Sequence, residues 1–201
     1  MKVKSLMIPN PITITKDASV GEAVQLMKIN SIRHLPVVSE GKLLQGFVTL
    51  ADLKSGLIPS FLGEVSLLDL MISDPITVGP DEDIETAAQL IYMHKISGMP
   101  VVEDEKLVGI ITESDILRAF INMMGILTAS SRIDVAIGDA PKAFNKALQI
   151  IYDKGGDIIN VGIMAHETSK RVYYFRLTVC KTDVIKAALE EQGFEVLYAA
   201  D

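Results

Sequence analysis

The sequence predicts an α/β chain with two copies of a β-α-β-β-α unit followed by one β-α-β-β-α-β unit. The repeat is visible at once, because residues 7–13 read MIPNPIT and residues 71–77 read MISDPIT. A second sign is the frame of glycine, two apolar residues, threonine and a later aspartate, which occurs as GFVTLAD and again as GIITESD. The predicted units span residues 1–60, 61–122 and 132–201, with residues 123–131 as a linker.

Each repeat is expected to follow the same order of elements. A first strand, Pro11–Ile14, precedes a helix whose apolar residues recur at helical spacing from Val20, with Ser19 as its N-cap. A buried strand with the sequence LPVV comes next, and a strand that starts at Gly46 leads into the second helix. The second copy places the same elements at Pro75–Val78, Asp83, Ile84, the MPVV segment and Gly109. A unit of this size buries its sheet poorly alone, so the two copies are expected to pack with pseudo-twofold symmetry around two equivalent clefts.

The Thr-x-x-Asp step occurs at the start of the second helix in both repeats. Thr49 and Thr112 fit helix N-caps, with Asp52 and Asp115 completing capping boxes and complementing the helix dipole. The same residues also suit ligand binding, because a carboxylate accepts hydrogen bonds from two adjacent hydroxyls and a helix N-terminus attracts phosphate. The sequence leaves both interpretations open for the threonines and favours binding for the aspartates.

The composition describes a globular chain and excludes several partner classes. The 201 residues are 49% hydrophobic and 22% charged, with a net charge of -7. This acidic balance, without a Lys/Arg cluster, argues against nucleic acid and against an anionic membrane surface as partners. No apolar run approaches the roughly 20 residues of a spanning helix, and the N-terminal residues lack the order of a signal peptide, so a cytoplasmic location is expected.

Signals of catalysis or metal binding are lacking in the sequence. It contains one cysteine, three scattered histidines and none of the common catalytic or nucleotide-loop motifs. The symmetric recurrence of Asp52 and Asp115 suits binding, whereas acid–base catalysis needs two groups in unlike environments. We therefore predict no catalytic residue and no metal site.

The ordered repeat of these motifs resembles the tandem CBS-domain pair, or Bateman module, over about residues 1–122. The resemblance implies a non-enzymatic regulatory protein whose clefts bind AMP, ADP, ATP or S-adenosylmethionine, without a prosthetic group. It also implies that the threonine of each Thr-x-x-Asp step contacts phosphate or ribose and that the aspartate holds the ribose diol.

The two clefts are expected to differ, because the first repeat has Arg33 and His34 where the second has Ser97 and Gly98. A guanidinium offers a fork of donors to phosphate, and an imidazole adds a contact that depends on pH. The cleft around Arg33, His34, Thr49 and Asp52 is therefore predicted to prefer a phosphorylated ligand. The cleft around Ser97, Thr112 and Asp115 is predicted to be weaker, empty or suited to an uncharged adenosyl group.

The resemblance further implies composite clefts, in which the adenine rests on the first strand and the PVV edge of the opposite repeat. This expectation brings Thr77, Val78 and Pro100 to the first cleft. It brings Thr13, Ile14 and Pro36 to the second. Simple core packing is the alternative for these apolar residues.

The C-terminal unit is predicted to have the ferredoxin-like order of elements. Ile133, Val135 and Ile137 alternate as in a strand, and a helical pattern then ends at Gly155. Two strands joined by a polar turn over residues 166–171, a helix over 182–192 and a closing strand complete the order.

This unit resembles the ACT domain, a regulatory fold that commonly pairs side by side and binds amino acids near the loop after its first strand. The loop over residues 139–144 matches the family's pattern, except that Lys142 stands where glycine is expected. A lysine restricts the approach of a ligand to the backbone, so the resemblance implies pairing more strongly than amino-acid binding.

The complete order of units resembles the bacterial acetoin-utilisation proteins of the AcuB type. Our first hypothesis is thus a sensor that signals through the ACT-like unit, across a homodimer or to a regulated protein partner. The alternative is a structural oligomerisation module whose Thr-x-x-Asp steps serve only as caps.

Overall fold

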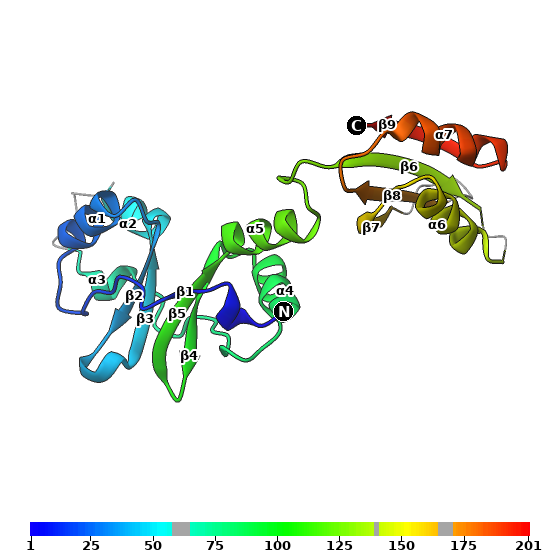
Figure 1. Cartoon of the computed structure of the whole chain (residues 1–201). Coiled ribbons are helices and arrows are strands. Elements are labelled where there is room, and N and C mark those ends of the chain that lie inside the picture. Colours follow the sequence, from blue (N-terminus) through cyan, green and yellow to red (C-terminus); the bar gives the residue numbers. More distant parts are fainter. Residues whose placement is uncertain (58–64, 139–140, 165–170) are drawn as a thin grey trace. The chain divides into compact units, whose positions relative to one another are not determined.

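The computed structural model describes residues 1–57, 65–138, 141–164 and 171–201 (Figure 1). Its contacts divide the chain into two compact units, Met1–Leu117 and Arg118–Asp201. Asp139 and Ala140 of the expected loop over residues 139–144 lie outside the described ranges, as does His166 of the expected polar turn.

The first unit contains the two predicted repeats, apart from residues 118–123 at the end of the last helix, which belong to the second unit. The first repeat comprises η1 (Val3–Ser5), β1 (Ile8–Pro9), α1 (Val20–Ile29), β2 (His34–Val38), η2 (Glu40–Lys42), β3 (Leu44–Thr49) and α2 (Leu50–Leu57). The second comprises α3 (Leu67–Leu70), α4 (Ile84–His94), β4 (Gly98–Glu103), β5 (Lys106–Thr112) and α5 (Glu113–Met123). Each repeat has its own buried apolar cluster, centred on Leu35 and Val48 in the first and on Met99 and Ile111 in the second. The predicted repeat architecture is therefore confirmed.

The two repeats exchange the segments that precede them. Strand β1 pairs with β5 of the second repeat, and Ile72 forms the equivalent bridge with Phe47 of the first. Glycine permits this close approach, because a Cβ atom at Gly109 would lie 2.5 Å from Met7 Sδ and one at Gly46 would lie 2.8 Å from Met71 Sδ. The repeated frame thus needs glycine at the point where the two halves meet, because a side chain there would collide with the methionine of the opposite segment.

The expected first strand of each repeat is shorter than predicted. Only single parallel bridges form, Ile14 with Val37 and Val78 with Val101. Within the first, Ile14 N–H donates to the Pro36 carbonyl and Val38 N–H donates to the Ile14 carbonyl. The next hydrogen bond of such a ladder would need an N–H on Pro36, which proline lacks. Pro100 limits the second copy in the same way.

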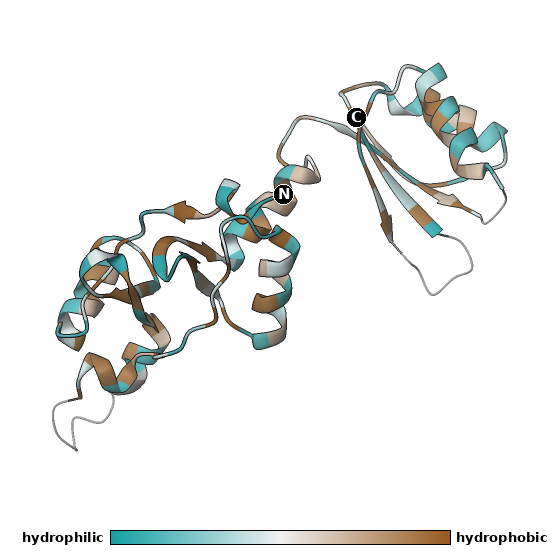
Figure 2. Cartoon of the chain, turned by 90° about the horizontal axis from the view of Figure 1, so that it is seen from below, coloured by the Kyte–Doolittle hydropathy of each residue, from teal (hydrophilic) through white to brown (hydrophobic). Residues whose placement is uncertain are grey.

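The second unit has the predicted ferredoxin-like order. Its elements are β6 (Ser131–Ile137), α6 (Ala143–Asp153), β7 (Ile158–Met164), β8 (Arg171–Leu177), α7 (Thr182–Glu191) and β9 (Glu195–Ala200). The strands form an antiparallel sheet in the order β7-β8-β6-β9. Both helices pack on one sheet face, because Ile133, Val135 and Phe175 share one core with Ala147 and Ile185. In Figure 2 the strands of both units carry many of the hydrophobic residues.

Lys142 precedes α6 in a backbone conformation that usually favours glycine. Its φ angle is 67°, in the left-handed region. The position therefore keeps the glycine-like geometry of the motif, although its side chain is lysine.

Asp201 caps helix α7 from the far end of the unit. Its Oδ1 accepts hydrogen bonds from Thr182 N–H and Oγ1–H, both 2.8 Å, and its Oδ2 accepts one from Lys181 Nζ. These bonds, led by that of the Thr182 N–H, lower the pKa of Asp201 to about 2.

The Asp201 cap is expected to give a stabilisation that disappears in acid. The folded pKa lies below the ordinary value of 3.8, so the contribution is complete above that value and is lost as the pH falls through about 2. The thermal midpoints of the native chain and Asp201→Asn, followed by circular dichroism, should differ at about pH 5 and converge near pH 2. Asp183→Asn, an exposed change on the same helix, is the matched control. A difference that persists undiminished near pH 2 would contradict the assignment.

Candidate functional site

Two symmetry-related clefts lie between the repeats of the first unit. The larger, the Thr49 cleft, is a cavity of about 450 Å³. Phe47, Thr49, Ala51 and Asp52 of the first repeat line it together with positions 72, 74–76 and 95–98 of the second. The smaller, the Thr112 cleft, has about 280 Å³ and is lined by Ile110 and Thr112 with positions 8, 10–12 and 31–34. The lining of both clefts is composite, as the resemblance implied.

Both Thr-x-x-Asp steps form the predicted capping interactions. Asp52 Oδ2 accepts hydrogen bonds from Thr49 N–H at 2.9 Å and Thr49 Oγ1–H at 2.7 Å. Asp115 Oδ2 accepts the equivalent bonds from Thr112 at 3.0 and 2.6 Å. The caps fix each aspartate at the N-terminus of a helix, where an anion is favoured.

The two aspartates differ in their access to the clefts. Asp52 is partly exposed and lines the Thr49 cleft. Asp115 is 4% exposed and is not among the residues that line the Thr112 cleft. A ligand in the Thr49 cleft can therefore reach the carboxylate, whereas the second copy offers Thr112 alone.

A third cavity, of about 270 Å³, adjoins the Thr49 cleft. We call it the basic cavity, because Arg33 and Lys54 both line it and both are exposed. It shares Thr49, Ala51 and Ser97 with the Thr49 cleft, so the two form a continuous surface. Two cations beside the N-terminal turn of α2 make a favourable place for phosphate.

His34 and Ser97 join the two repeats at this point. His34 Nε2 lies 2.6 Å from Ser97 Oγ, and the imidazole, 7% exposed, stacks on Phe47 with ring centroids 5.8 Å apart. Gly98, the repeat equivalent of His34, also lies near the ring, but the tightest contacts of a Cβ atom there would be with the Ile111 carbonyl and Thr112 Cγ2, both 3.1 Å away. The difference between the repeats thus has a packing role in addition to any ligand contact.

Burial lowers the pKa of His34, and the neighbouring Arg33 lowers it further, while Glu113, Asp115 and Asp52 oppose the shift. The folded chain therefore binds a proton at His34 less readily than the unfolded chain does.

Stability is expected to fall as the pH decreases below about 6.5, because His34 must then carry a charge in a buried place. Because the pKa of His34 is lower in the folded chain than in the unfolded chain, the unfolded chain binds more protons and stability rises with pH through the titration range of histidine. Thermal midpoints between about pH 5 and 8 should show a steeper slope for the native chain than for His34→Gln, whose amide can still bond to Ser97. His94→Gln, at an exposed position, should keep the native slope. Equal slopes for all three proteins would refute the prediction.

Several predicted site residues have positions different from those expected. Ser97 lines the Thr49 cleft, and Arg33 and His34 line both the basic cavity and the Thr112 cleft. The loop before each PVV strand is tied to the first segment of its own repeat by the parallel bridge, so both enter the same cleft. Ser97, which was expected to group with Thr112, is thus among the lining residues of the Thr49 cleft and not of the Thr112 cleft.

The residues expected to contact the adenine are not those that line the clefts. Pro75 and Ile76 line the Thr49 cleft in place of Thr77, Val78 and Pro100. Val78 is only 2% exposed and belongs to the apolar core. In the other cleft, Pro11 and Ile12 replace Thr13, Ile14 and Pro36. Because each bridge involves a single residue, the residues that precede it are not part of the sheet and line the clefts instead.

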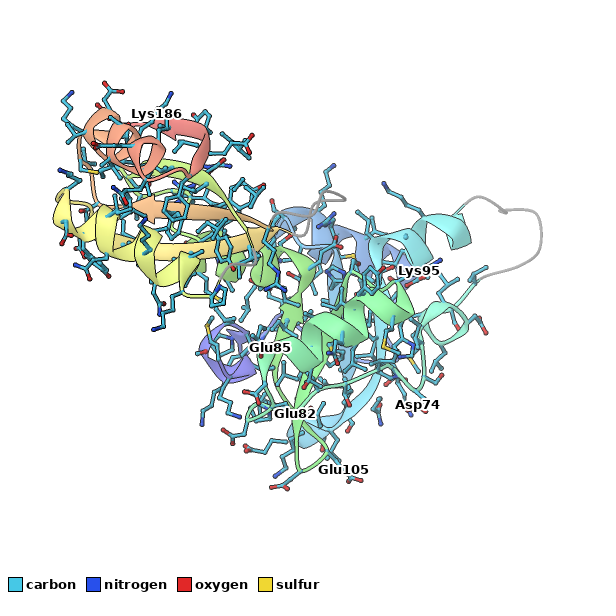
Figure 3. All side chains as sticks on the ribbon, turned by 90° about the vertical axis from the view of Figure 1, so that its right-hand side faces the viewer. Asp74, Glu82, Glu85, Lys95, Glu105 and Lys186 are labelled. Carbon is cyan, nitrogen blue, oxygen red and sulfur yellow. The ribbon has the colours of Figure 1, made fainter. Side chains whose placement is uncertain are left out.

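Charged residues that the sequence analysis missed also line these cavities. They are Lys54 in the basic cavity, and Asp74 and Lys95 in the Thr49 cleft. The side chains of Asp74 and Lys95 are labelled in Figure 3. Asp74 and Lys95 take the places of Asn10 and Ser31 in the first repeat, so alignment of the two copies could have identified them as a charge difference. Lys54 lies in the last turn of the short helix α2, two residues beyond the motif.

Neither a metal centre nor a membrane span is found in the described ranges. No group of three or more His, Cys, Asp or Glu side chains there is placed to hold a metal ion. The helices of that part of the chain are all too short or too polar to cross a bilayer.

Comparison with known structures finds similar CBS-domain pairs. A protein described as an acetoin utilization protein (AcuB) from Vibrio cholerae is 35% identical, with a TM-score of 0.55 over 61% of this chain and 92% of that one. The CBS domain pair of protein MJ0100, in complex with 5'-methylthioadenosine and S-adenosyl-L-methionine, is 32% identical, with a TM-score of 0.57 over 61% and 97%. CBSX2 in complex with AMP is 28% identical, with a TM-score of 0.55 over 61% and 97%.

Curated relatives are larger enzymes that share only part of their length with this chain. Inosine-5'-monophosphate dehydrogenase of Methanocaldococcus jannaschii is 33% identical over 75% of this chain, which spans only 30% of that enzyme.

The CBS domain model matches residues 3–58 and 67–122, which together make up more than half of the chain. These are the two repeats that enclose the clefts. The chain belongs to the CBS-domain family.

Proposed function

We propose that the chain is a regulatory module that binds an adenine nucleotide, with AMP as the best fit, in the Thr49 cleft. The carrying observation is the continuity between this cleft and the basic cavity through Thr49, Ala51 and Ser97. Adenosine occupies the larger space, with Asp52 accepting hydrogen bonds from the ribose diol. The phosphate lies near Arg33 and Lys54 at the start of α2. The CBSX2 complex with AMP supports this ligand class.

The Thr112 cleft is proposed to take an uncharged adenosyl ligand such as 5'-methylthioadenosine. Its walls are largely apolar, with Ile12, Ile32 and Ile110 among them, and its aspartate is buried. The MJ0100 complex contains 5'-methylthioadenosine and S-adenosyl-L-methionine together, which supports two ligand types in one CBS pair.

We further propose that ligand binding regulates a partner or a homodimer and that the chain itself is not an enzyme. Helix α5 begins beside the Thr112 cap and continues past Leu117 into the second unit. A ligand that binds one arrangement of the repeats better than another shifts the population of that arrangement. The ACT-like unit is the proposed receiver of this shift.

A second candidate function is a structural oligomerisation module. The capping boxes favour it, because Thr49 and Asp52 satisfy each other without any ligand. This alternative predicts a dimer that is indifferent to every adenosyl compound.

The deciding experiment measures binding of AMP, ADP, ATP, adenosine, S-adenosylmethionine and 5'-methylthioadenosine to the full chain by calorimetry and by thermal midpoint. A ligand at about 100 times its dissociation constant adds roughly 2.7 kcal/mol to the stability of the folded state, which is readily detected. Saturable binding of AMP is the expected result. Indifference to all six compounds, with a stable dimer, would support the structural module.

A further inference from the structure

The second unit has a cavity of its own, of about 290 Å³, on the sheet face opposite α6 and α7. Ile133 and Phe175 point into the helix-covered core, so the alternate residues Arg132, Tyr174 and Arg176 lie on the other face. The strand registers set Asn160 of β7 and Arg132 of β6 on either side of Arg176 of β8. These three polar residues form one row across the floor of the cavity.

The end of α5, with the segment that follows it, supplies an apolar wall for this cavity. Phe120, Met124 and Ile126 line it, and Phe120 is 55% exposed. Two contacts hold the segment to the sheet. Asn160 Nδ2 donates to the Met123 carbonyl at 3.0 Å. Gly125, with φ of 63°, packs so closely that a Cβ atom there would lie 3.2 Å from Arg176 Cδ. The wall is thus held by specific contacts.

The two arginines on the floor have different electrostatic surroundings. Arg132 Nε and Nη2 each donate to Asp134 at 2.7 Å, and its guanidinium lies 5.0 Å from the ring centroid of Tyr174 and 5.3 Å from that of Tyr198. Its charge is therefore matched. Arg176 Nη1 donates to Ser130 Oγ at 2.8 Å, and within the described ranges no carboxylate forms an ion pair with it.

Among the residues that the structure describes, the cavity therefore combines apolar walls with one positive charge that has no carboxylate partner, and its lining contains no acidic residue. A guanidinium in such surroundings favours an anion, and a carboxylate matches its paired donors. The volume corresponds to roughly ten water molecules at their share of the liquid, so the ligand is small.

We propose that this cavity binds a small organic carboxylate, whose carboxylate pairs with Arg176 and whose apolar tail lies against Phe120 and Ile126. The site is separate from the adenosyl clefts and does not depend on them. It makes the second unit a ligand-binding module in its own right.

The test uses hexanoate as the probe and the full chain as the protein, with binding followed by saturation-transfer NMR and titration of chemical shifts. Hexanoate should bind saturably. Hexan-1-ol, which lacks the charge, and acetate, which lacks the tail, should bind at least about tenfold more weakly. Arg176→Gln should weaken hexanoate binding at least about tenfold, whereas Arg171→Gln, an exposed change on the same strand, should not alter it. Phe120→Ala, at an exposed wall position, should also weaken binding without loss of fold.

Four outcomes would overturn the proposal. One is the absence of hexanoate binding, and another is equal affinity for hexan-1-ol. A third is unchanged affinity in a folded Arg176→Gln variant. If sedimentation equilibrium shows instead that Phe120→Ala separates a dimer that hexanoate does not affect, the apolar wall is an interface and the site assignment is wrong. AMP binding by the Arg176→Gln variant is measured in parallel and should equal that of the native chain. A failure of the hexanoate site can then be distinguished from a failure of the adenosyl clefts.

Discussion

Replacement of both Arg33 and Lys54 by glutamine is expected to weaken AMP binding roughly 10- to 100-fold while leaving adenosine binding nearly unchanged. Both side chains line the basic cavity, which contains no acidic residue in its lining. Adenosine lacks the phosphate that this cavity would hold, and its ribose and base contact the adjoining Thr49 cleft. The loss should therefore depend on the phosphate alone.

Calorimetric titration of AMP and adenosine on the same variant measures this difference directly. High salt should weaken AMP binding by the native chain, because Arg33 and Lys54 are exposed and salt screens exposed charges. The difference in AMP affinity between the native chain and the variant should therefore be smaller at high salt. Lys28→Gln, an exposed change in α1 that removes one positive charge outside both cavities, is the control and should bind AMP normally. Equal losses of AMP and adenosine would place the phosphate elsewhere.

The sequence predicted the repeats and their secondary structure because these depend on local patterns. The i, i+3, i+4 spacing from Val20, the Ser19 cap and the glycine before each Thr-x-x-Asp step all act within a few residues. Ser19 indeed forms a capping box with Glu22. The order of elements along the second unit followed from the alternation in its strands and the helical spacing between them, which together fit the ferredoxin-like pattern.

Contacts between the repeats could not be predicted in the same way. The pairing of β1 with β5 joins residues that are distant in sequence, and no local pattern marks it. The grouping of Ser97 with Thr49 follows from the same exchange, since it depends on which cleft each loop enters. The short bridges at Ile14 and Val78 could have been predicted from Pro36 and Pro100, because proline lacks the N–H group that the next hydrogen bond of the ladder requires.

Asp52→Ala is expected to reduce binding of both AMP and adenosine on the order of a hundredfold, because two hydrogen bonds from the ribose to a charged acceptor are lost. The variant should also have a lower thermal midpoint, since the same carboxylate accepts from Thr49 N–H and Oγ1–H at the start of α2. Loss of the cap alone predicts the second effect without the first. The two roles of the motif are thus separable in one protein.

Asp69→Ala is the matched control for this separation. Asp69 Oδ2 accepts from Ser66 N–H at 2.9 Å and from Ser66 Oγ–H at 2.7 Å, the same distances as in the Thr49 cap. It lines neither cleft. Its removal should lower the midpoint and leave both ligands bound with native affinity, as measured by calorimetry below the midpoint of each variant. If Asp52→Ala behaves like Asp69→Ala, capping of the helix is the whole role of the motif. The clefts would then recognise ribose through other groups or not bind it.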